Sequence, residues 1–274
     1  MGEGARAWAA AAAIGLAGCG GCGPKADLRG LPIEADLAAG RTSGAASFDH
    51  APWARVLAAA AHPEDGTVDY DAVPRADLDR YVAAVAQAPL DQLPAAEQQA
   101  LLINAYNALT VTLILDQPAR PASIRDLPDP WGAAQWTVGG HAVSLDDLEH
   151  GLLRPLFQDP RLHFALNCAS VGCPPLRAEP FAADTLDAQL DHAARATLAH
   201  DRWLRADGDT LHVTKLLDWY GDDFTRAGWS PTAPTRAAWL AIYGPPAVKT
   251  VVDAADGEPD LRFLDYGWEL NAPR

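Results

Sequence analysis

The sequence predicts an α+β domain that is mostly helical and carries a small antiparallel sheet. Three observations lead to this class. Long segments place apolar residues at helical spacing, a short run has the pattern of a hairpin, and a few other short apolar runs have the pattern of strands. The chain has 274 residues, of which 49% are hydrophobic and 9 are Trp. This size and composition suit one globular domain with a large core.

The N-terminus has the pattern of a secretory signal that ends at a lipid-attachment site. One positive charge, Arg6, precedes an Ala-rich apolar run that is too short for a spanning helix. The stretch LAGC, ending at Cys19, resembles a bacterial lipobox, in which the chain is cut before the cysteine and the thiol receives a diacylglyceryl group. We expect removal of residues 1–18 and anchoring to a membrane through acyl chains on Cys19. An ordinary cleaved signal is the alternative. Gly20 favours the outer membrane as the destination.

The segment after the signal differs in composition from the rest of the chain. Residues 19–47 are rich in Gly and Ala and show little periodicity, which predicts a flexible tether. A single domain is expected over residues 48–274. The formal net charge is −15, and no basic stripe offsets it. Such a chain repels phosphate backbones, so nucleic acid is not an expected partner.

The first part of the domain is predicted to be helical. Two amphipathic helices flank the turn-rich HPEDGTVDY, with Trp53, Val56 and Leu57 as core candidates. Residues 95–118 form the longest apolar segment, and its apolar faces predict a helix buried nearly all round. Asn104 lies in this helix. A buried amide needs hydrogen-bond partners, so nearby groups must satisfy it.

Short strands and further helices follow. QWTVGGHAV is expected to form a hairpin, and Ser144 with Asp147 resembles a capping box at the start of a helix. Glu149 lies beside the apolar stripe of that helix, which is unusual for a carboxylate. The alternating run RLHFALN predicts a strand. A helix over residues 185–200, a strand TLHVT and a helix KLLDWYGDDF complete the prediction.

Four motifs, LLINAYNALT, VSLDDLEHGLLRP, RLHFALNCASVGCPPLR and LDYGWELN, together resemble the domain of unknown function 547 family over about residues 97–271. The family is thought to be similar to papain-like and transglutaminase-like thiol hydrolases, so the resemblance implies a distant likeness to that fold and chemistry. The resemblance places these residues in the family signature: Asn104, Tyr106, Asn107, Glu149, His150, Arg154, His163, Asn167, Cys168, Cys173 and Pro174. Gly267 departs from the acidic residue expected there.

Cys168 and Cys173 have two interpretations. In an oxidising envelope two nearby cysteines tend to form a disulfide, and Gly172 makes the required tight turn feasible. Alternatively, one of them is a catalytic thiol. Asn167 is a good helix N-cap residue, and a helical turn starting there would favour a thiolate at Cys168. Cys173 precedes a proline that holds it extended, so Cys168 is the preferred nucleophile.

The catalytic interpretation needs a base, an orienting group and an oxyanion donor. His163 is one candidate base, but an extended strand would place it roughly 16 Å from Cys168 at about 3.3 Å per residue. His150 is the other candidate. Glu149 could orient the base or instead pair with Arg154. Asn104 is a candidate oxyanion donor, although an amide that bridges the helix to a loop is the favoured interpretation.

Two functions from different classes remain open at this point. One is a lipid-anchored hydrolase or acyltransferase that acts on amide bonds in peptide or cell-wall material. The other is a non-catalytic surface lipoprotein that binds a peptide, glycan or protein partner, with Cys168 and Cys173 as a structural disulfide. No metal or cofactor is expected, because HExxH and a CxxC in the folded part are both missing from the sequence. A zinc site built on His163 and Cys168 is the less favoured alternative.

Overall fold

The computed structural model describes residues 27–273. Cys19 and Cys22, and with them the expected signal and lipid attachment, lie outside the described residues. The α-helices are α1 (Ile33–Ser43), α2 (Ala51–Ala60), α3 (Arg75–Ala86), α4 (Ala95–Leu115), α5 (Arg154–Phe157), α6 (Leu186–Leu198), α7 (Leu216–Trp219), α8 (Arg236–Tyr243) and α9 (Pro246–Ala254). Short helical turns are η1 (Leu90–Gln92), η2 (Ile124–Asp126), the π-helix η3 (Asp147–Leu153) and the 3-10 helix η4 (Pro160–Phe164).

The strands within residues 27–273 form three small sheets. They are β1 (Ala61–His62) with β2 (Thr67–Val68), β3 (Trp136–Val138) with β4 (His141–Val143), and β5 (Leu204–Asp207) with β6 (Thr210–Val213) and β7 (Asp260–Phe263). All pairings are antiparallel except that of β6 with β7, which is parallel. The predicted mostly helical α+β class is confirmed.

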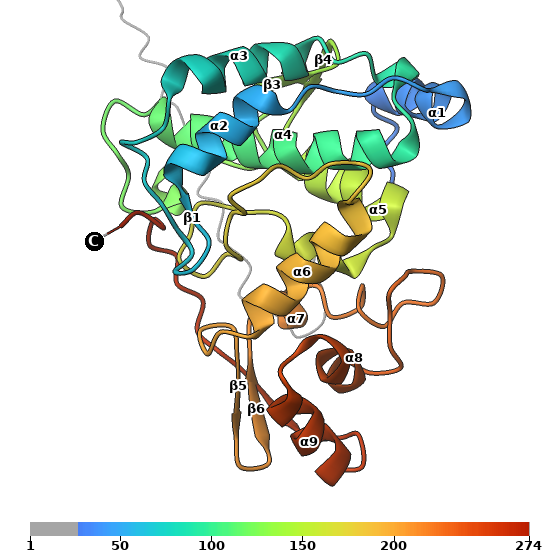
Figure 1. Cartoon of the computed structure of the whole chain (residues 1–274), viewed down its shortest axis with the longest axis vertical. Coiled ribbons are helices and arrows are strands. Elements are labelled where there is room, and N and C mark those ends of the chain that lie inside the picture. Colours follow the sequence, from blue (N-terminus) through green and yellow to red (C-terminus); the bar gives the residue numbers. More distant parts are fainter. Residues whose placement is uncertain (1–26, 274) are drawn as a thin grey trace, which may run out of the picture.

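The core is built around α4. Every residue from Ala100 to Ile114 is buried, as the all-round apolar pattern predicts. Figure 1 shows α2 and α3 lying over α4 in the upper part of the view, while β5, β6, α8 and α9 form the lower part. The predicted core residues Trp53, Val56 and Leu57 are buried on α2.

The predicted tether is wrong for part of its length. Residues Ile33–Ser43 form α1, whose Ile33 and Leu37 are fully buried. A side chain at Gly40 would meet the carbonyls of Leu90 and Leu93, so α1 approaches η1 closely through a residue without a side chain. The Ala- and Gly-rich composition of this segment led to the wrong prediction. The same small residues permit the close approach of the helix to its neighbours.

The predicted strand RLHFALN is also wrong. Pro160–Phe164 form a 3-10 helix, and the Asp159 side chain accepts a hydrogen bond from the N–H of Arg161 at its start. All residues from Asp159 to Asn167 are buried. The alternation therefore does not reflect one exposed and one buried face, and periodicity cannot separate a short buried turn from a strand.

Candidate functional site

The two cysteines within residues 27–273 form a disulfide. Cys168 and Cys173 are bonded through their sulfurs, with their α-carbons 6.1 Å apart and a sequence separation of 5. Cys173 is buried, whereas Cys168 is partly exposed. We call residues 168–173 the cysteine loop. The structural interpretation of the pair is therefore the one observed, and neither sulfur is a free thiol in this structure.

The conformation of the cysteine loop corrects the predicted helical turn at Cys168. The Asn167 side chain accepts a hydrogen bond from the N–H of Ala169 at 2.9 Å, as an N-cap residue would, but no helix follows. Ala169 instead adopts a left-handed φ of 62°, an unusual conformation for a residue with a side chain. The N–H of Cys168 donates to the sulfur of Cys173 at 3.0 Å. The disulfide requires this tight turn, and the turn excludes the helix.

The last motif of the chain lies against the cysteine loop. The N–H of Val171 donates to the carbonyl of Glu269, and that of Gly172 donates to the carbonyl of Gly267. The hydroxyl of Tyr266 lies 3.3 Å from the Cys168 sulfur and 3.2 Å from the Cys173 sulfur. We call residues 265–271 the closing segment. The closing segment holds the cysteine loop through backbone hydrogen bonds. Its Tyr266 side chain covers the disulfide.

The asparagines of α4 connect this helix to neighbouring loops. The Asn104 amide donates to the carbonyl of Phe181 at 2.8 Å and accepts from the N–H of Phe181 at 3.0 Å. Asn107 donates to the carbonyl of Ala165 and accepts from the N–H of Asn167. Both amides thus bridge the helix to a loop, which is the favoured interpretation of Asn104.

His163 lies in a buried ion-pair cluster. Its Nε2 lies 2.8 Å from Asp223 Oδ2, and the same oxygen accepts a hydrogen bond from Arg154 Nε at 2.7 Å. The ring of His163 also stacks on Tyr220, with centroids 4.1 Å apart. Burial lowers the pKa of His163, although Asp223 opposes this change. Burial also opposes ionisation of Asp223, but the hydrogen bonds from His163 and Arg154 outweigh it and keep the pKa of Asp223 below its ordinary value.

Glu149 and His150 lie in the π-helix η3 and border the same cluster. Burial raises the pKa of the Glu149 carboxyl, although the positive charges of His163 and Arg154 and the hydroxyls of Tyr106 and Tyr220 oppose this change. His150 Nδ1 lies 3.2 Å from Arg154 Nη1. Burial and, secondarily, the positive charge of Arg154 lower the pKa of His150 to about 4. Single π-turns inside helices are frequent at functional sites, and here the turn directs two ionisable residues inward.

Most of the predicted site residues lie in one of two separate clusters, the acid–base cluster and the cysteine loop. Glu149, His150 and His163 belong to an acid–base cluster with Asp223. Within the described residues, the side chain that hydrogen-bonds to the Cys168 sulfur is Tyr266, not a histidine. Sequence reasoning missed Asp223 because nothing local marks it among the many acidic residues. Arg154 pairs with Asp223 at 2.7 Å.

An aromatic surface lies beside the disulfide, and sequence reasoning missed it as a unit. Trp219, Tyr266 and Trp268 are all partly exposed. Their ring centroids are 4.8 Å apart for Trp219 and Tyr266, 5.8 Å for Trp219 and Trp268, and 4.6 Å for Tyr266 and Trp268. Trp131 extends the group at 6.0 Å from Trp268, and Arg125 lies over the Trp268 ring at 5.0 Å. The signal in the sequence was the density of aromatic residues in LLDWY and LDYGW. We call these four aromatic residues the aromatic surface.

Residues 27–273 lack the features of two other kinds of site. No group of three or more His, Cys, Asp or Glu side chains is arranged there to hold a metal ion. Within the same residues, none of the helices combines the length and apolarity that crossing a membrane requires.

Comparisons with curated proteins and with solved structures each gave no match. The expected likeness to papain-like and transglutaminase-like hydrolases therefore stays a prediction. A family model does match part of the chain. The matched part contains three of the four motifs and both cysteines of the disulfide, whereas LDYGWELN lies beyond it. Residues 90–197 match the model of the family described as "Protein of unknown function, DUF547".

Proposed function

We propose that this protein is a non-catalytic lipoprotein of the bacterial cell envelope that binds a peptide, glycan or protein partner through its aromatic surface. The observation that carries the proposal is the Cys168–Cys173 disulfide. A thiol hydrolase needs a free thiolate, and both sulfurs are bonded to each other. The lipid anchor on Cys19 rests on the lipobox-like sequence LAGC.

The surroundings of the disulfide support a role in binding. Trp219, Tyr266 and Trp268 are partly exposed and contact one another, and large rigid aromatic residues are enriched where proteins bind partners. The disulfide and the closing segment fix the position of Tyr266. The polar groups of Asn104 that a hydrolase would use for an oxyanion are engaged with Phe181.

A cysteine-dependent hydrolase or acyltransferase acting on amide bonds is the second candidate. The partial exposure of Cys168 favours it, together with the partly buried Glu149 and the His163–Asp223 pair. This candidate requires an external thiol to reduce the disulfide, which would release Cys168 and Cys173 as thiols. It also requires a movement that brings a base to Cys168.

Two measurements on the whole chain, expressed in a bacterial host and extracted in detergent, test the proposal. The first is intact mass with and without alkylation under non-reducing conditions, followed by peptide mapping. We expect a chain that begins at an acylated Cys19 and no alkyl group on Cys168 or Cys173. Mapping separates these residues from Cys22. Alkylation of Cys168 without reductant would contradict the proposed role of the disulfide.

The second measurement is co-sedimentation with isolated envelope material. We expect the wild type and a Cys168→Ser/Cys173→Ser variant both to bind, because binding needs no thiol. Trp268→Ala should weaken binding at least tenfold, whereas the control Trp136→Ala, in the β3–β4 hairpin, should not. Release of soluble products by the wild type under reducing conditions, lost in Cys168→Ser, would establish the hydrolase instead.

A further inference from the structure

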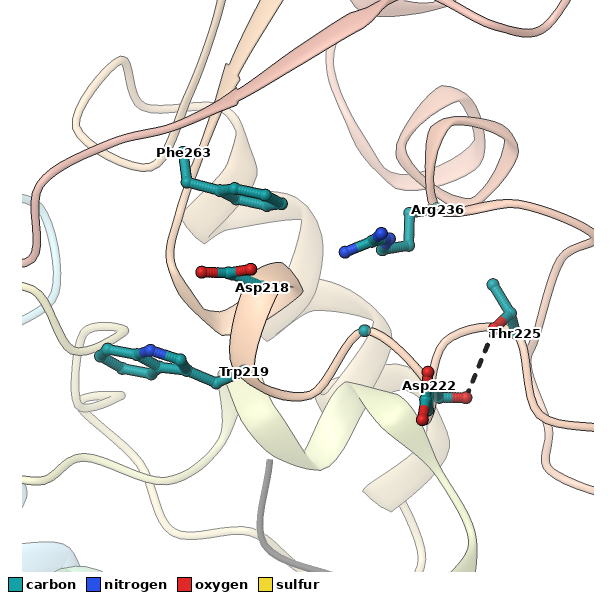
Figure 2. A pocket seen from close by; sticks show the side chains of 7 residues that line it. Asp218, Trp219, Asp222, Thr225, Arg236 and Phe263 are labelled. Carbon is teal, nitrogen blue, oxygen red and sulfur yellow. Dashed lines mark hydrogen bonds between the residues drawn. The ribbon is translucent and has the colours of Figure 1, made fainter. Parts of the chain in front are cut away.

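A pocket of about 410 Å³ lies next to the aromatic surface, and its lining is chemically mixed. Figure 2 shows Phe263, Asp218 and Trp219 on one side of it and Arg236, Thr225 and Asp222 on the other. These side chains come from α7, the segment after it, α8 and β7. The volume is in the range of pockets that hold small ligands. Trp219 belongs to both the pocket and the aromatic surface, so the two are continuous.

The aromatic residues give the pocket apolar faces. Trp219 lines it from the end of α7 and is stacked against Trp268, with an angle of 29° between the ring planes. Phe263 lines it from β7, and Arg236 lies 5.8 Å from its ring centroid. Two rigid aromatic rings on one side of a pocket suit a ligand that has flat C–H faces.

The charged residues of the pocket compensate one another. Asp218 pairs with Lys215 at 3.1 Å. Asp222 is exposed and lies opposite the aromatic side, on the same side of the pocket as Arg236 (Figure 2). Counting Lys215, the pocket region has two carboxylates and two cations. Because these charges balance, the pocket region has no net charge that would select an anionic or a cationic ligand, and this favours a neutral one.

The polar groups of the pocket offer both kinds of hydrogen bond. The carboxylate of Asp222 accepts and the guanidinium of Arg236 donates, while the hydroxyl of Thr225 donates to the carbonyl of Asp222 at 3.5 Å and can accept from a ligand (Figure 2). Arg236 Nη1 donates to the carbonyl of Leu217 at 2.9 Å, which fixes the guanidinium at the pocket wall. A Cβ on Gly221 would lie 2.9 Å from that nitrogen, so the glycine leaves room for it. Ligand hydroxyls donate and accept, which matches this lining.

We infer that the pocket is a subsite for a neutral, hydroxyl-rich glycan. The inference rests on the proposed binding function and names the ligand class for it. A sugar ring has an apolar C–H face for Trp219 and Phe263, and its hydroxyls pair with Asp222, Thr225 and Arg236. The aromatic surface extends from Trp219 toward Trp268 and Trp131, so it would contact further sugar units of the same chain.

Calorimetric titration of the whole protein in detergent with tetrasaccharides of different charge tests the inference. The neutral probes are the tetramers of glucose, mannose and N-acetylglucosamine. The cationic probe is the tetramer of glucosamine, and the anionic probe is the tetramer of galacturonic acid. We expect at least one neutral tetramer to bind at least tenfold more tightly than both charged ones. No neutral binding at millimolar concentration, or tighter binding of a charged tetramer, would overturn the inference.

Single substitutions distinguish the contribution of this pocket to binding from that of the rest of the aromatic surface. Asp222→Asn should weaken binding of the neutral tetramer about tenfold, because an amide accepts hydrogen bonds less strongly than a carboxylate. The matched control is Asp207→Asn, an exposed carboxylate in the β5–β6 hairpin, which should leave the affinity unchanged. Equal affinities of Asp222→Asn and wild type would overturn the pocket assignment.

The outcomes for the pocket and for the proposed function are distinguishable. If envelope binding depends on Trp268 while no tetrasaccharide binds and Asp222→Asn sediments normally, the pocket inference fails and the proposed function stands. If neither envelope material nor any tetrasaccharide binds, both fail.

Discussion

Gly172 and Tyr266 lie so close that a Cβ on residue 172 would be 2.9 Å from three atoms of the Tyr266 ring. The same tyrosine holds its hydroxyl against both sulfurs of the disulfide. Only a residue without a side chain therefore permits the closing segment to cover the cysteine loop.

We expect Gly172→Ala to displace Tyr266 and to lower the free energy of unfolding by about 1–3 kcal/mol, as overpacking does. Near-UV circular dichroism should change because Tyr266 packs against Trp219 and Trp268. The control is Gly151→Ala, where the new Cβ would meet the side chain of Arg29, which is 39% exposed and can move. If Gly172→Ala leaves the spectrum and the free energy of unfolding unchanged, the Tyr266 ring can move aside for the new Cβ, and the prediction is wrong.

Removal of the disulfide should destabilise the fold by a limited amount. The bridge closes a loop with a sequence separation of 5, so the chain-entropy relation predicts a loss of about 2 kcal/mol in Cys168→Ser/Cys173→Ser. Urea unfolding measures this value. The reduced wild type should show the same loss, and adding reductant to the double variant should change nothing. Equal stability of the oxidised wild type and the double variant would contradict the prediction.

Replacing the buried carboxylate of Asp223 should lower the free energy of unfolding far more than replacing an exposed carboxylate. Asp223 accepts hydrogen bonds from Arg154 and His163 in the core, so Asp223→Asn should cost about 3–5 kcal/mol. The matched control is Asp77→Asn, because Asp77 also contacts two cations, Arg55 and Arg80, but at the surface. That change should cost much less, because solvent screens a surface ion pair. Similar losses for the two variants, measured by urea unfolding, would contradict the buried ion pair.

Acid should destabilise the protein through His50. Its Nδ1 lies 2.8 Å from the hydroxyl of Tyr81 and 3.2 Å from the amide nitrogen of Asn104. The amide nitrogen can only donate, so Nδ1 is the acceptor and the ring is neutral. Burial lowers the pKa of His50 from 6.5 to about 4, with a smaller opposing effect of Asp49.

Because the folded pKa lies below the unfolded one, the unfolded chain binds the proton more readily between these values. The stabilisation by neutral His50 is complete above about pH 6.5 and is lost as the pH falls toward about 4. We expect a loss of about 2 kcal/mol over this range, allowing for the part of the ring that solvent reaches. His50→Asn keeps an acceptor that does not titrate, so its unfolding free energy should vary less with pH. His192→Gln, at an exposed histidine, serves as control. Identical pH profiles for wild type and His50→Asn would exclude His50 as the cause.

The sequence predicted the elements with strong periodicity. The helix α4, the β3–β4 hairpin and the capping box are all present, and Ser144 and Asp147 exchange backbone-to-side-chain hydrogen bonds. The sequence-based prediction was wrong at η4, because residues buried on all sides happen to alternate as in a strand. It was also wrong at α1, because this helix packs through small residues. The sequence narrowed the chemistry of Cys168 to two alternatives but could not choose between them.

The sequence by itself determined the helical class and the buried α4 helix, and it named Cys168, Cys173 and His163 as candidate site residues, because these follow from local spacing and residue type. Only the tertiary structure decided which side chains meet. His163 pairs with Asp223, 60 positions away, and Tyr266 reaches Cys168 from 98 positions away. Which residues meet across such long sequence separations depends on how the helices and loops pack against one another. The cysteine loop joins Cys168 to Cys173 because the left-handed turn at Ala169 and the closing segment hold it there, and neither leaves a local signal in the sequence.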